Sequence, residues 1–270
     1  MSTLYLVVTP IGNLNDISLR AIETLKKVDF IACENPNNSL KLLQNFGISK
    51  NLLQVNAVHE VQMSNNILKL LKEGNEVAFI SDAGFPCISD PGSTLVKMCV
   101  ENNIKVTTVG GNSAFLNALL GSDIDTTRFT FIGFLSSKAG TLKNELQKYK
   151  NRCETLIFYE SSHRIVDTLN IMYEVFGERK VCVAKELTKM FETYIRFTLH
   201  ENITLTNDQQ KGEFVIVVEG NKDDEISLES LAEKVKELIA LGVSTKSACE
   251  FIAKENNISK NALYKLIHEK

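Results

Sequence analysis

The sequence lacks the long apolar run that a membrane helix needs. None of its apolar stretches approaches about 20 residues. The first of them, Leu4–Val8, is too short for a signal peptide and has no basic flank before it. We therefore expect a cytoplasmic protein that does not enter a membrane.

Patterns for a metal site or a disulfide framework are also missing. The six cysteines have no C-x-x-C spacing, and the four histidines lack the helical pairing typical of zinc sites. We expect no metal, and we expect reduced thiols, as is usual for a cytosolic protein.

Several signatures of nucleotide-binding proteins and hydrolases are absent. The loop after the first predicted strand contains Gly12 but no dinucleotide-binding glycine fingerprint, and no Walker lysine is found. No Ser-His-Asp order or paired-carboxylate spacing indicates hydrolysis. The net charge of -3 argues against a protein that coats nucleic acid nonspecifically. The basic run Lys138–Arg152 is, by itself, better explained as a solvated helix face than as an RNA contact.

The composition is that of an ordinary globular protein of more than one domain. The chain has 270 residues, of which 44% are hydrophobic and 23% charged. Short apolar runs alternate with amphipathic helical stretches, which predicts an α/β fold. In the first half the predicted strands are Leu4–Val8, Asp29–Cys33, Val77–Ile80 and Lys105–Val109. The predicted helices between and after them are Ile17–Lys27, Ser39–Asn45, Met63–Glu73, Ser93–Asn102 and Ser113–Leu120.

A second series of strands follows a linker at Gly121–Arg128. Its predicted strands are Phe129–Ile132, Thr155–Tyr159, Val181–Ala184 and Glu213–Glu219, with helices at Thr141–Tyr149 and Arg164–Phe176. The alternation in Thr193–Leu205 predicts an antiparallel ribbon and therefore a mixed sheet. After a charged linker at 221–225, only helical patterns remain. We predict domains at 1–120, 121–222 and 223–270, and the last of these is all-helical. Its two short terminal helices resemble a helix-turn-helix. They can equally be an appendage that only packs against the rest of the protein, and the spacing favours this second interpretation.

Three loops of the first half follow strands and precede helices. They are Thr9–Asn13, the run SDAGFPCISDPG at Ser81–Gly92, and Gly110–Ala114. Loops at the carboxyl ends of parallel strands meet at one edge of the sheet, where α/β proteins bind ligands. Any one of them alone is adequately explained as a tight turn, but together they predict a binding edge.

A similar loop in the second half, Tyr159–Arg164, again leaves a strand and enters a helix. Ser162 is a plausible N-cap of that helix, and Glu160 would lie at the strand end. His163 is explained better as a hydrogen-bonded surface residue than as a general base.

Several of these segments occur in the same order along the chain as in a known protein family. They are Leu4–Leu14, Ser81–Gly92, Ile157–Arg164, Lys185–Lys189, Lys211–Glu213 and Ser259–Tyr264. On these motifs the chain resembles the ribosomal RNA methyltransferases of the tetrapyrrole methylase superfamily. The resemblance implies two α/β domains with S-adenosylmethionine in the cleft between them, a small helical C-terminal domain and a homodimer. It implies methyl transfer to the ribose 2′-hydroxyl of a cytidine in small-subunit (16S) ribosomal RNA.

The resemblance also implies roles for individual residues. The expected cofactor-binding residues are Pro10, Ile11, Gly12, Ser81, Asp82, Ala83, Phe85, Ile88, Ser113, Ala114, Tyr159, Glu160, Leu187 and Glu213. Glu160, Lys185 and Glu186 are the candidates for assisting removal of the hydroxyl proton. Lys138, Lys143, Arg164 and Lys189 are candidates for RNA phosphate contacts.

The chain departs from the family pattern at a few positions. They are Asn35–Asn37 in place of Asp-Thr-Arg, the stretch 57–61, Phe85 in place of threonine, Gly110–Asn112 in place of Pro-Gly-Pro, and Ser136 in place of proline. Two alternatives therefore stay open: a superfamily methylase acting on a tetrapyrrole or a protein, and a cofactor-binding relic with reduced activity. The C-terminal motif argues against the first.

Overall fold

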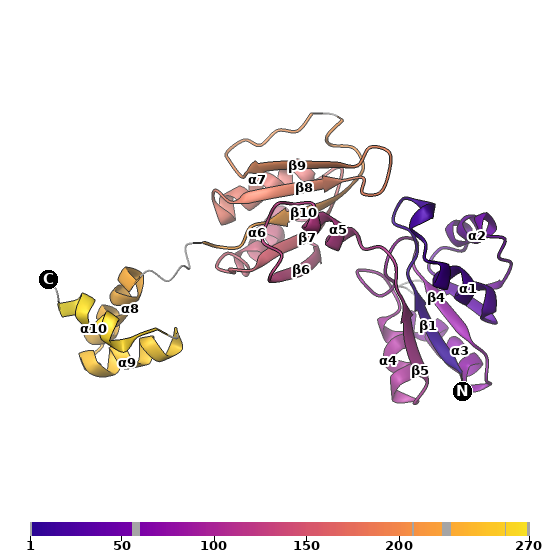
Figure 1. Ribbon diagram of the computed structural model, residues 1–270, viewed down its shortest axis with the longest axis horizontal. Coiled ribbons are helices and arrows are strands. Elements are labelled where there is room, and N and C mark those ends of the chain that lie inside the picture. The colour runs from indigo at the N-terminus through magenta and orange to yellow at the C-terminus, as the bar shows by residue number, and fades with distance from the viewer. Residues whose placement is uncertain (1, 56–59, 207, 223–227, 257, 269–270) are drawn as a thin grey trace. The chain divides into compact units, whose positions relative to one another are not determined.

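The computed structural model describes residues 2–55, 60–206, 208–222, 228–256 and 258–268 (Figure 1). The chain divides into two compact units. Unit 1 comprises Met1–Lys148 and Glu154–Glu219, and unit 2 comprises Tyr149–Cys153 and Gly220–Lys270. Parts of the stretch at 57–61 and of the charged linker at 221–225 lie outside the described residues.

The first half of unit 1 is built on a parallel sheet of five strands in the order β3-β2-β4-β1-β5. The strands are β1 (Thr3–Val7), β2 (Phe30–Cys33), β3 (Asn51–Gln54), β4 (Val77–Ile80) and β5 (Lys105–Val109). The elements that connect them are η1 (Leu14–Asp16), α1 (Leu19–Lys27), α2 (Pro36–Asn45), α3 (Glu60–Lys72) and α4 (Ser93–Glu101). Because β1 lies between β4 and β5, the loops after these three strands leave the sheet side by side.

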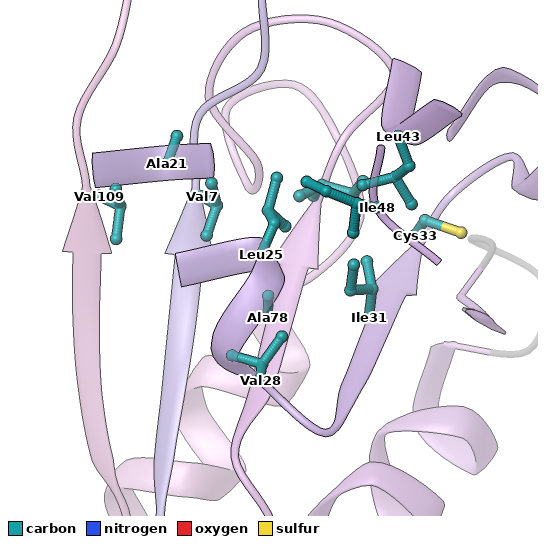
Figure 2. Close-up of a cluster of buried hydrophobic side chains, with 11 residues drawn as sticks. Val7, Ala21, Leu25, Val28, Ile31, Cys33, Leu43, Ile48, Ala78 and Val109 are labelled. Carbon is teal, nitrogen blue, oxygen red and sulfur yellow. The ribbon is translucent and has the colours of Figure 1, made fainter. Parts of the chain in front are cut away.

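Hydrophobic clusters cover both faces of this sheet. On one face, Ala21 and Leu25 of α1 and Leu43 of α2 pack against strand residues that include Val7 and Ile31 (Figure 2). On the other face, buried residues of α3 and α4 pack against the alternate strand residues, among them Leu4, Val77 and Phe79. Burial on both faces accounts for the nearly uninterrupted apolar sequences of the central strands.

The second half of unit 1 is a mixed sheet in the order β6-β7-β10-β8-β9. Its strands are β6 (Phe129–Phe134), β7 (Thr155–Ser161), β8 (Lys180–Lys185), β9 (Thr193–Thr198) and β10 (Glu213–Val218). Only the β6–β7 pair is parallel, which confirms the predicted mixed sheet. The helices of this half are α5 (Ala114–Leu120), α6 (Ala139–Gln147) and α7 (Ile165–Phe176). Ala118 and Leu119 of α5 pack against β7, β8 and β10.

Unit 2 contains α8 (Leu228–Ala240), α9 (Thr245–Glu255) and α10 (Lys260–His268). Leu231 and Val235, Ala248 and Ile252, and Leu263 form its buried core. The division into domains at 1–120, 121–222 and 223–270 stays a prediction. Among the helices of the described ranges, none is both long and apolar enough to span a bilayer.

Two sequence expectations require correction. Strand β3 was not anticipated: both of its end residues, Asn51 and Gln54, are exposed, so its sequence lacks the apolar signal of the central strands. Ser162 is not the N-cap of α7, because the helix begins at Ile165 and Arg164 occupies the cap position without a side-chain hydrogen bond. Gly47, with φ of 64°, follows the C-cap residue Phe46 of α2, a position where glycine commonly ends a helix.

Candidate functional site

A cavity of about 510 Å³ lies within unit 1. The loops after β1, β4 and β5 and the start of α5 contribute part of its wall. The other part comes from β6, β7, β10, the residues next to β7 and β10, and the segment after β8. The lining residues are Ile11, Asp82, Ala83, Gly84, Phe85, Ile88, Ser89, Asp90, Ser113, Ala114, Phe115, Phe134, Tyr159, Glu160, Ser161, Ser162, Leu187, Gly212, Glu213, Phe214 and Val215.

Backbone hydrogen bonds hold two of the first-half loops together. The amide of Thr9 donates to the carbonyl of Gly84 at 3.0 Å, and the amide of Gly84 donates back at 3.1 Å. The Thr9 hydroxyl also donates to the carbonyl of Ser81 at 3.2 Å. The loop after β1 is therefore fixed to the loop after β4 at the carboxyl edge of the sheet.

The loop after β4 has an unusual backbone. Cys87 and Ser89 have positive φ values of 69° and 63°, and φ is also positive at Gly84 and Gly92. Such conformations are uncommon for residues other than glycine and persist where the surrounding structure holds them. One such restraint comes from α3, because Glu60 accepts hydrogen bonds from the amides of Gly92 at 2.9 Å and Thr94 at 3.2 Å. The turn at Ser89 brings Asp90 to the cavity wall.

Carboxyl groups gather near this part of the cavity. Burial, reinforced by the charges of Glu34 and Asp82, raises the pKa of Asp90 to about 6, although a hydrogen bond from Ser81 acts in the opposite direction. Burial, together with the charge of Asp82, also raises the pKa of Glu34. Asn38 donates a 2.7 Å hydrogen bond to Oδ2 of Asp82. With this pKa, Asp90 loses its proton as the pH rises through about 6.

Glu160, at the end of β7, is 3% exposed and its oxygens already have partners. Oε1 accepts from the Ser161 amide at 2.7 Å and from its hydroxyl at 3.3 Å. Oε2 accepts from the Thr168 hydroxyl at 2.7 Å and lies 3.4 Å from the guanidinium of Arg164. A carboxylate with these bonds is suited to fixing the start of α7, and it is poorly suited to accepting a proton from a substrate.

Aromatic rings form another part of the wall. Phe115 stacks on Phe131 with ring centroids 4.5 Å apart, and Phe131 meets Tyr159 edge to face at 4.9 Å. Phe134 lies 5.4 Å from Tyr159. Burial raises the pKa of Tyr159 to about 12, so its hydroxyl stays protonated. This part of the wall is mainly apolar.

The segment after β8 brings Leu187 to the cavity between two residues with positive φ, Glu186 at 50° and Thr188 at 66°. Lys189 holds this segment, since its ammonium lies 3.0 Å from Glu186 and 2.8 Å from Glu213. Glu186 also accepts from the amide of Glu213 at 3.0 Å.

Two glycines have no room for a side chain beside this segment. A Cβ on Gly12 would meet the Lys189 side chain at 2.6 Å. A Cβ on Gly212, whose φ is +110°, would meet Oε1 of Glu186 at 2.5 Å. Close packing at both glycines keeps the segment after β8 against the loop after β1 and the start of β10.

The structure brings most of the expected cofactor-binding residues to one cavity. Those on its wall are Ile11, Asp82, Ala83, Phe85, Ile88, Ser113, Ala114, Tyr159, Glu160, Leu187 and Glu213. Pro10, Gly12 and Ser81 are not on the wall and instead lie in the loops that shape it. Sequence reasoning missed Asp90, Phe115 and Phe134. Asp90 could have been predicted, because it belongs to the loop Ser81–Gly92. The two phenylalanines could not, because their sequence context does not distinguish them from core residues.

The expected catalytic and RNA-binding residues are placed less uniformly. Of the catalytic candidates, only Glu160 lines the cavity; Lys185 donates to the carbonyl of Asp208, and Glu186 is bound by Lys189. Arg164 donates to the carbonyl of Ser136 at 2.6 Å and so fixes the chain after β6.

The remaining RNA candidates differ in their surroundings. Lys143 lies 2.7 Å from Glu174 on the surface, and Lys138 is exposed at the start of α6. Lys189 is engaged by Glu186 and Glu213. Lys138 is therefore the candidate most open to a phosphate.

The cavity fits S-adenosylmethionine in size and chemistry. Its volume falls within the range of roughly 300–1,000 Å³ that is usual for small-molecule sites. Ile11, Ala114, Leu187 and Val215 offer an apolar surface for an adenine ring, and the carboxyl groups of Asp82 and Asp90 are suited to cationic groups. Within the described ranges, no group of three or more His, Cys, Asp or Glu side chains could hold a metal ion.

Comparisons with known proteins identify the family. The model of the Tetrapyrrole (Corrin/Porphyrin) Methylases matches residues 3–202. Ribosomal RNA small subunit methyltransferase I of Haemophilus influenzae is 42% identical over 97% of this chain and 94% of the relative. Its counterpart from Halalkalibacterium halodurans is 40% identical over 99% of this chain and 95% of the relative.

A solved structure shows the same fold at much lower identity. The methyltransferase CobJ superposes with a TM-score of 0.61 at 17% identity, covering 82% of this chain and 95% of its own. The chain belongs to the tetrapyrrole methylase family and, within it, to the ribosomal RNA small subunit methyltransferases I.

Proposed function

We propose that the protein is an S-adenosylmethionine-dependent methyltransferase that modifies the ribose 2′-hydroxyl of a cytidine in small-subunit (16S) ribosomal RNA. The observation that carries the proposal is that the family's sequence motifs in unit 1 each contribute residues to one cavity. Residues from the loops after β1, β4, β5 and β8 and from the end of β7 all line it. The RNA substrate follows from the near full-length similarity to the ribosomal RNA small subunit methyltransferases I.

The chain's own residues divide the task of binding. S-adenosylmethionine, when bound, supplies a methyl group on a positively charged sulfur. Ile11, Ala114 and Leu187 would bind the apolar part of the molecule, and Asp82 would accept hydrogen bonds from its hydroxyl or amino groups. Buried Ser113 adds a hydroxyl to the same wall. Alignment of the ribose hydroxyl with the reacting carbon then accounts for much of the rate.

The remaining task is to accept the ribose proton, and we assign it to the carboxylate of Asp90. A ribose hydroxyl is a weak nucleophile, so a general base with a pKa near the working pH is expected to help. Asp90 lines the cavity, and its pKa is raised to about 6 by burial and by Glu34 and Asp82. Glu160 is saturated with hydrogen bonds and is a positioning residue in this proposal.

We further propose that the protein works as a homodimer in the cytoplasm. The exposed apolar side chains of the segment after β8 support an association surface, since Met190 is 91% and Phe191 72% exposed. A cytoplasmic site of action agrees with a ribosomal substrate. Light scattering of the purified protein, with Phe191→Ser for comparison, tests the dimer: a monomer at micromolar concentration contradicts it.

The function is tested with isolated small ribosomal subunits and methyl-labelled S-adenosylmethionine. Labelled product mapped to a cytidine 2′-O position is expected for the wild type. Asp90→Asn is expected to lower kcat by roughly a hundredfold or more. Glu101→Gln, an exposed carboxylate paired with Lys97, is the matched control and should match the wild type. Absence of label in ribosomal RNA with the wild type contradicts the proposal.

A further inference from the structure

A second cavity, of about 330 Å³, lies beside the start of α7. Two segments far apart in the sequence form it: the turn and first residues of α7, and the chain leading to β10. Its lining residues are Ser162, His163, Val166, Asp167, Thr204, Leu205 and Gln210. Nothing in the methyl-transfer proposal above uses this cavity.

Ser162 lines both cavities, so the smaller cavity lies next to the larger one. A nucleotide presents its base and its 2′-hydroxyl from neighbouring carbons of one ribose ring. When the ribose reaches the larger cavity, its base must be accommodated close by. Enzymes that act on single nucleotides of RNA commonly move the base out of its stack into a fitted pocket. The smaller cavity is in the appropriate place for such a base.

The polar groups of this cavity are suited to reading a base edge. Asp167 is exposed, and its carboxylate has no hydrogen-bond or ion-pair partner among the described residues. Nε2 of Gln210 donates to the carbonyl of Leu205 at 2.6 Å, which fixes the orientation of the amide. The exposed ring of His163 provides a flat surface on which a base can stack.

A simpler explanation of Asp167 is its place in the first turn of α7, where negative charge is favoured by the helix dipole. That effect concerns stability alone. It makes no prediction about which base the protein accepts, so the two explanations can be separated by experiment.

We propose that the smaller cavity is the subsite for the base of the target nucleotide and that Asp167 accepts a hydrogen bond from the exocyclic amine of cytosine. This inference rests on the proposed function. Carboxylates are the natural partners of the cytosine amine. Uracil carries a carbonyl oxygen at the same place, and a carboxylate repels it. Asp167 is thereby a specificity-determining residue for cytidine over uridine.

The test compares Asp167→Asn with the wild type on small-subunit RNA that carries either cytidine or uridine at the modified position. An asparagine amide can donate to the uracil oxygen as well as accept from the cytosine amine. We expect the ratio of kcat/KM for cytidine over uridine to fall by roughly tenfold to a hundredfold, in line with the usual discrimination of a base contact. His163→Ala is expected to raise KM for both substrates and to leave the ratio unchanged.

Direct binding separates this inference from the proposed function. Cytidine 5′-monophosphate and uridine 5′-monophosphate are titrated into the full-length protein while the His163 ring resonances are followed by NMR. The wild type is expected to bind the cytidine nucleotide more tightly and Asp167→Asn to lose that preference. Equal binding of the two nucleotides by the wild type, or an unchanged preference in Asp167→Asn, overturns the subsite even if the enzyme methylates RNA. Preference for the cytidine nucleotide without methylation supports the subsite and contradicts the proposed function alone.

Discussion

The Thr168 hydroxyl donates a 2.7 Å hydrogen bond to Oε2 of Glu160. Thr168 is 1% exposed and Glu160 3%, so this bond joins the end of β7 to the first turn of α7 out of contact with water. Because the same carboxylate also binds the Ser161 amide, it sets the direction in which the chain passes from strand to helix. That turn contributes Ser161 and Ser162 to the larger cavity.

Thr168→Val tests this arrangement while keeping the shape of the side chain. The substitution leaves a buried carboxylate oxygen without its hydroxyl donor, and hydrogen bonds to charged groups contribute about 1.5–3 kcal/mol. We expect the free energy of unfolding to fall by an amount in that range, measured by urea denaturation. Thr198→Val, at an exposed position of β9, is the control and should change stability little. An equal effect of the two substitutions contradicts the role of the bond.

Gly212→Ala tests the packing at the start of β10. The backbone φ of +110° disfavours any L side chain, and the new methyl group would lie 2.5 Å from Oε1 of Glu186. Gly177→Ala is a matched control, since Gly177 also has positive φ, at +71°, but a Cβ there meets nothing within 4 Å.

Both alanine variants are expected to lose about 1 kcal/mol or more from backbone strain. Gly212→Ala should lose more, and it should also bind S-adenosylmethionine more weakly, because Gly212 and Glu213 line the larger cavity. Thermal denaturation and calorimetry measure the two effects. Unchanged affinity in Gly212→Ala argues against the packing of Glu186 as a determinant of the site.

Much of unit 1 follows from local sequence patterns, and the exceptions have physical causes. The central strands are predicted from their apolar runs because both faces of the sheet are buried. Strand β3 is not predicted, because its exposed end residues leave it without an apolar run. At the site, the turn residues of the loop after β4 predict a binding edge. The carboxylate of Glu160 is bound by Thr168 and Arg164. The sequence does not predict these contacts, because they form only when the chain folds.

Lys189→Met tests the ion pairs that hold the segment after β8. The ammonium group lies between Glu186 and Glu213, and methionine keeps much of the aliphatic contact with Gly12 while removing the charge. We expect S-adenosylmethionine to bind roughly threefold to tenfold more weakly, because a surface-proximal pair contributes about 1 kcal/mol. Lys211→Met is the control, as Lys211 makes an exposed pair with Asp208. If both variants lose the same affinity for S-adenosylmethionine, the loss comes from the change in net charge, and the role of the Lys189 ion pairs is contradicted.

The raised pKa of Asp90 predicts how stability depends on pH. Burial, the charge of Glu34 and the charge of Asp82 raise this pKa to about 6, against the opposing hydrogen bond from Ser81. In the unfolded chain an aspartate ionises near about 3.9. The folded protein therefore binds the proton more tightly, and the stability that this binding provides is lost as the pH rises from about 4 through about 6.

Asp90→Asn removes the ionisable group and keeps its shape. We expect the variant and the wild type to differ least in melting temperature at pH 4, where the carboxyl is neutral. At pH 7.5 the variant should be relatively more stable, because it no longer holds a disfavoured charge. Glu101→Gln serves as the control and should show no such dependence.

The same carboxylate has a second measurable consequence for the bound ligand. Ionised Asp90 attracts the positive sulfur of S-adenosylmethionine and has no comparable attraction for the neutral sulfur of S-adenosylhomocysteine. The ratio of their affinities, measured by calorimetry, should therefore shift toward S-adenosylmethionine as the pH rises through about 6 in the wild type. Asp90→Asn should flatten this dependence. A pH-independent ratio in the wild type would place the Asp90 charge too far from the sulfur to assist the reaction, and the assignment of Asp90 as proton acceptor would fail with it.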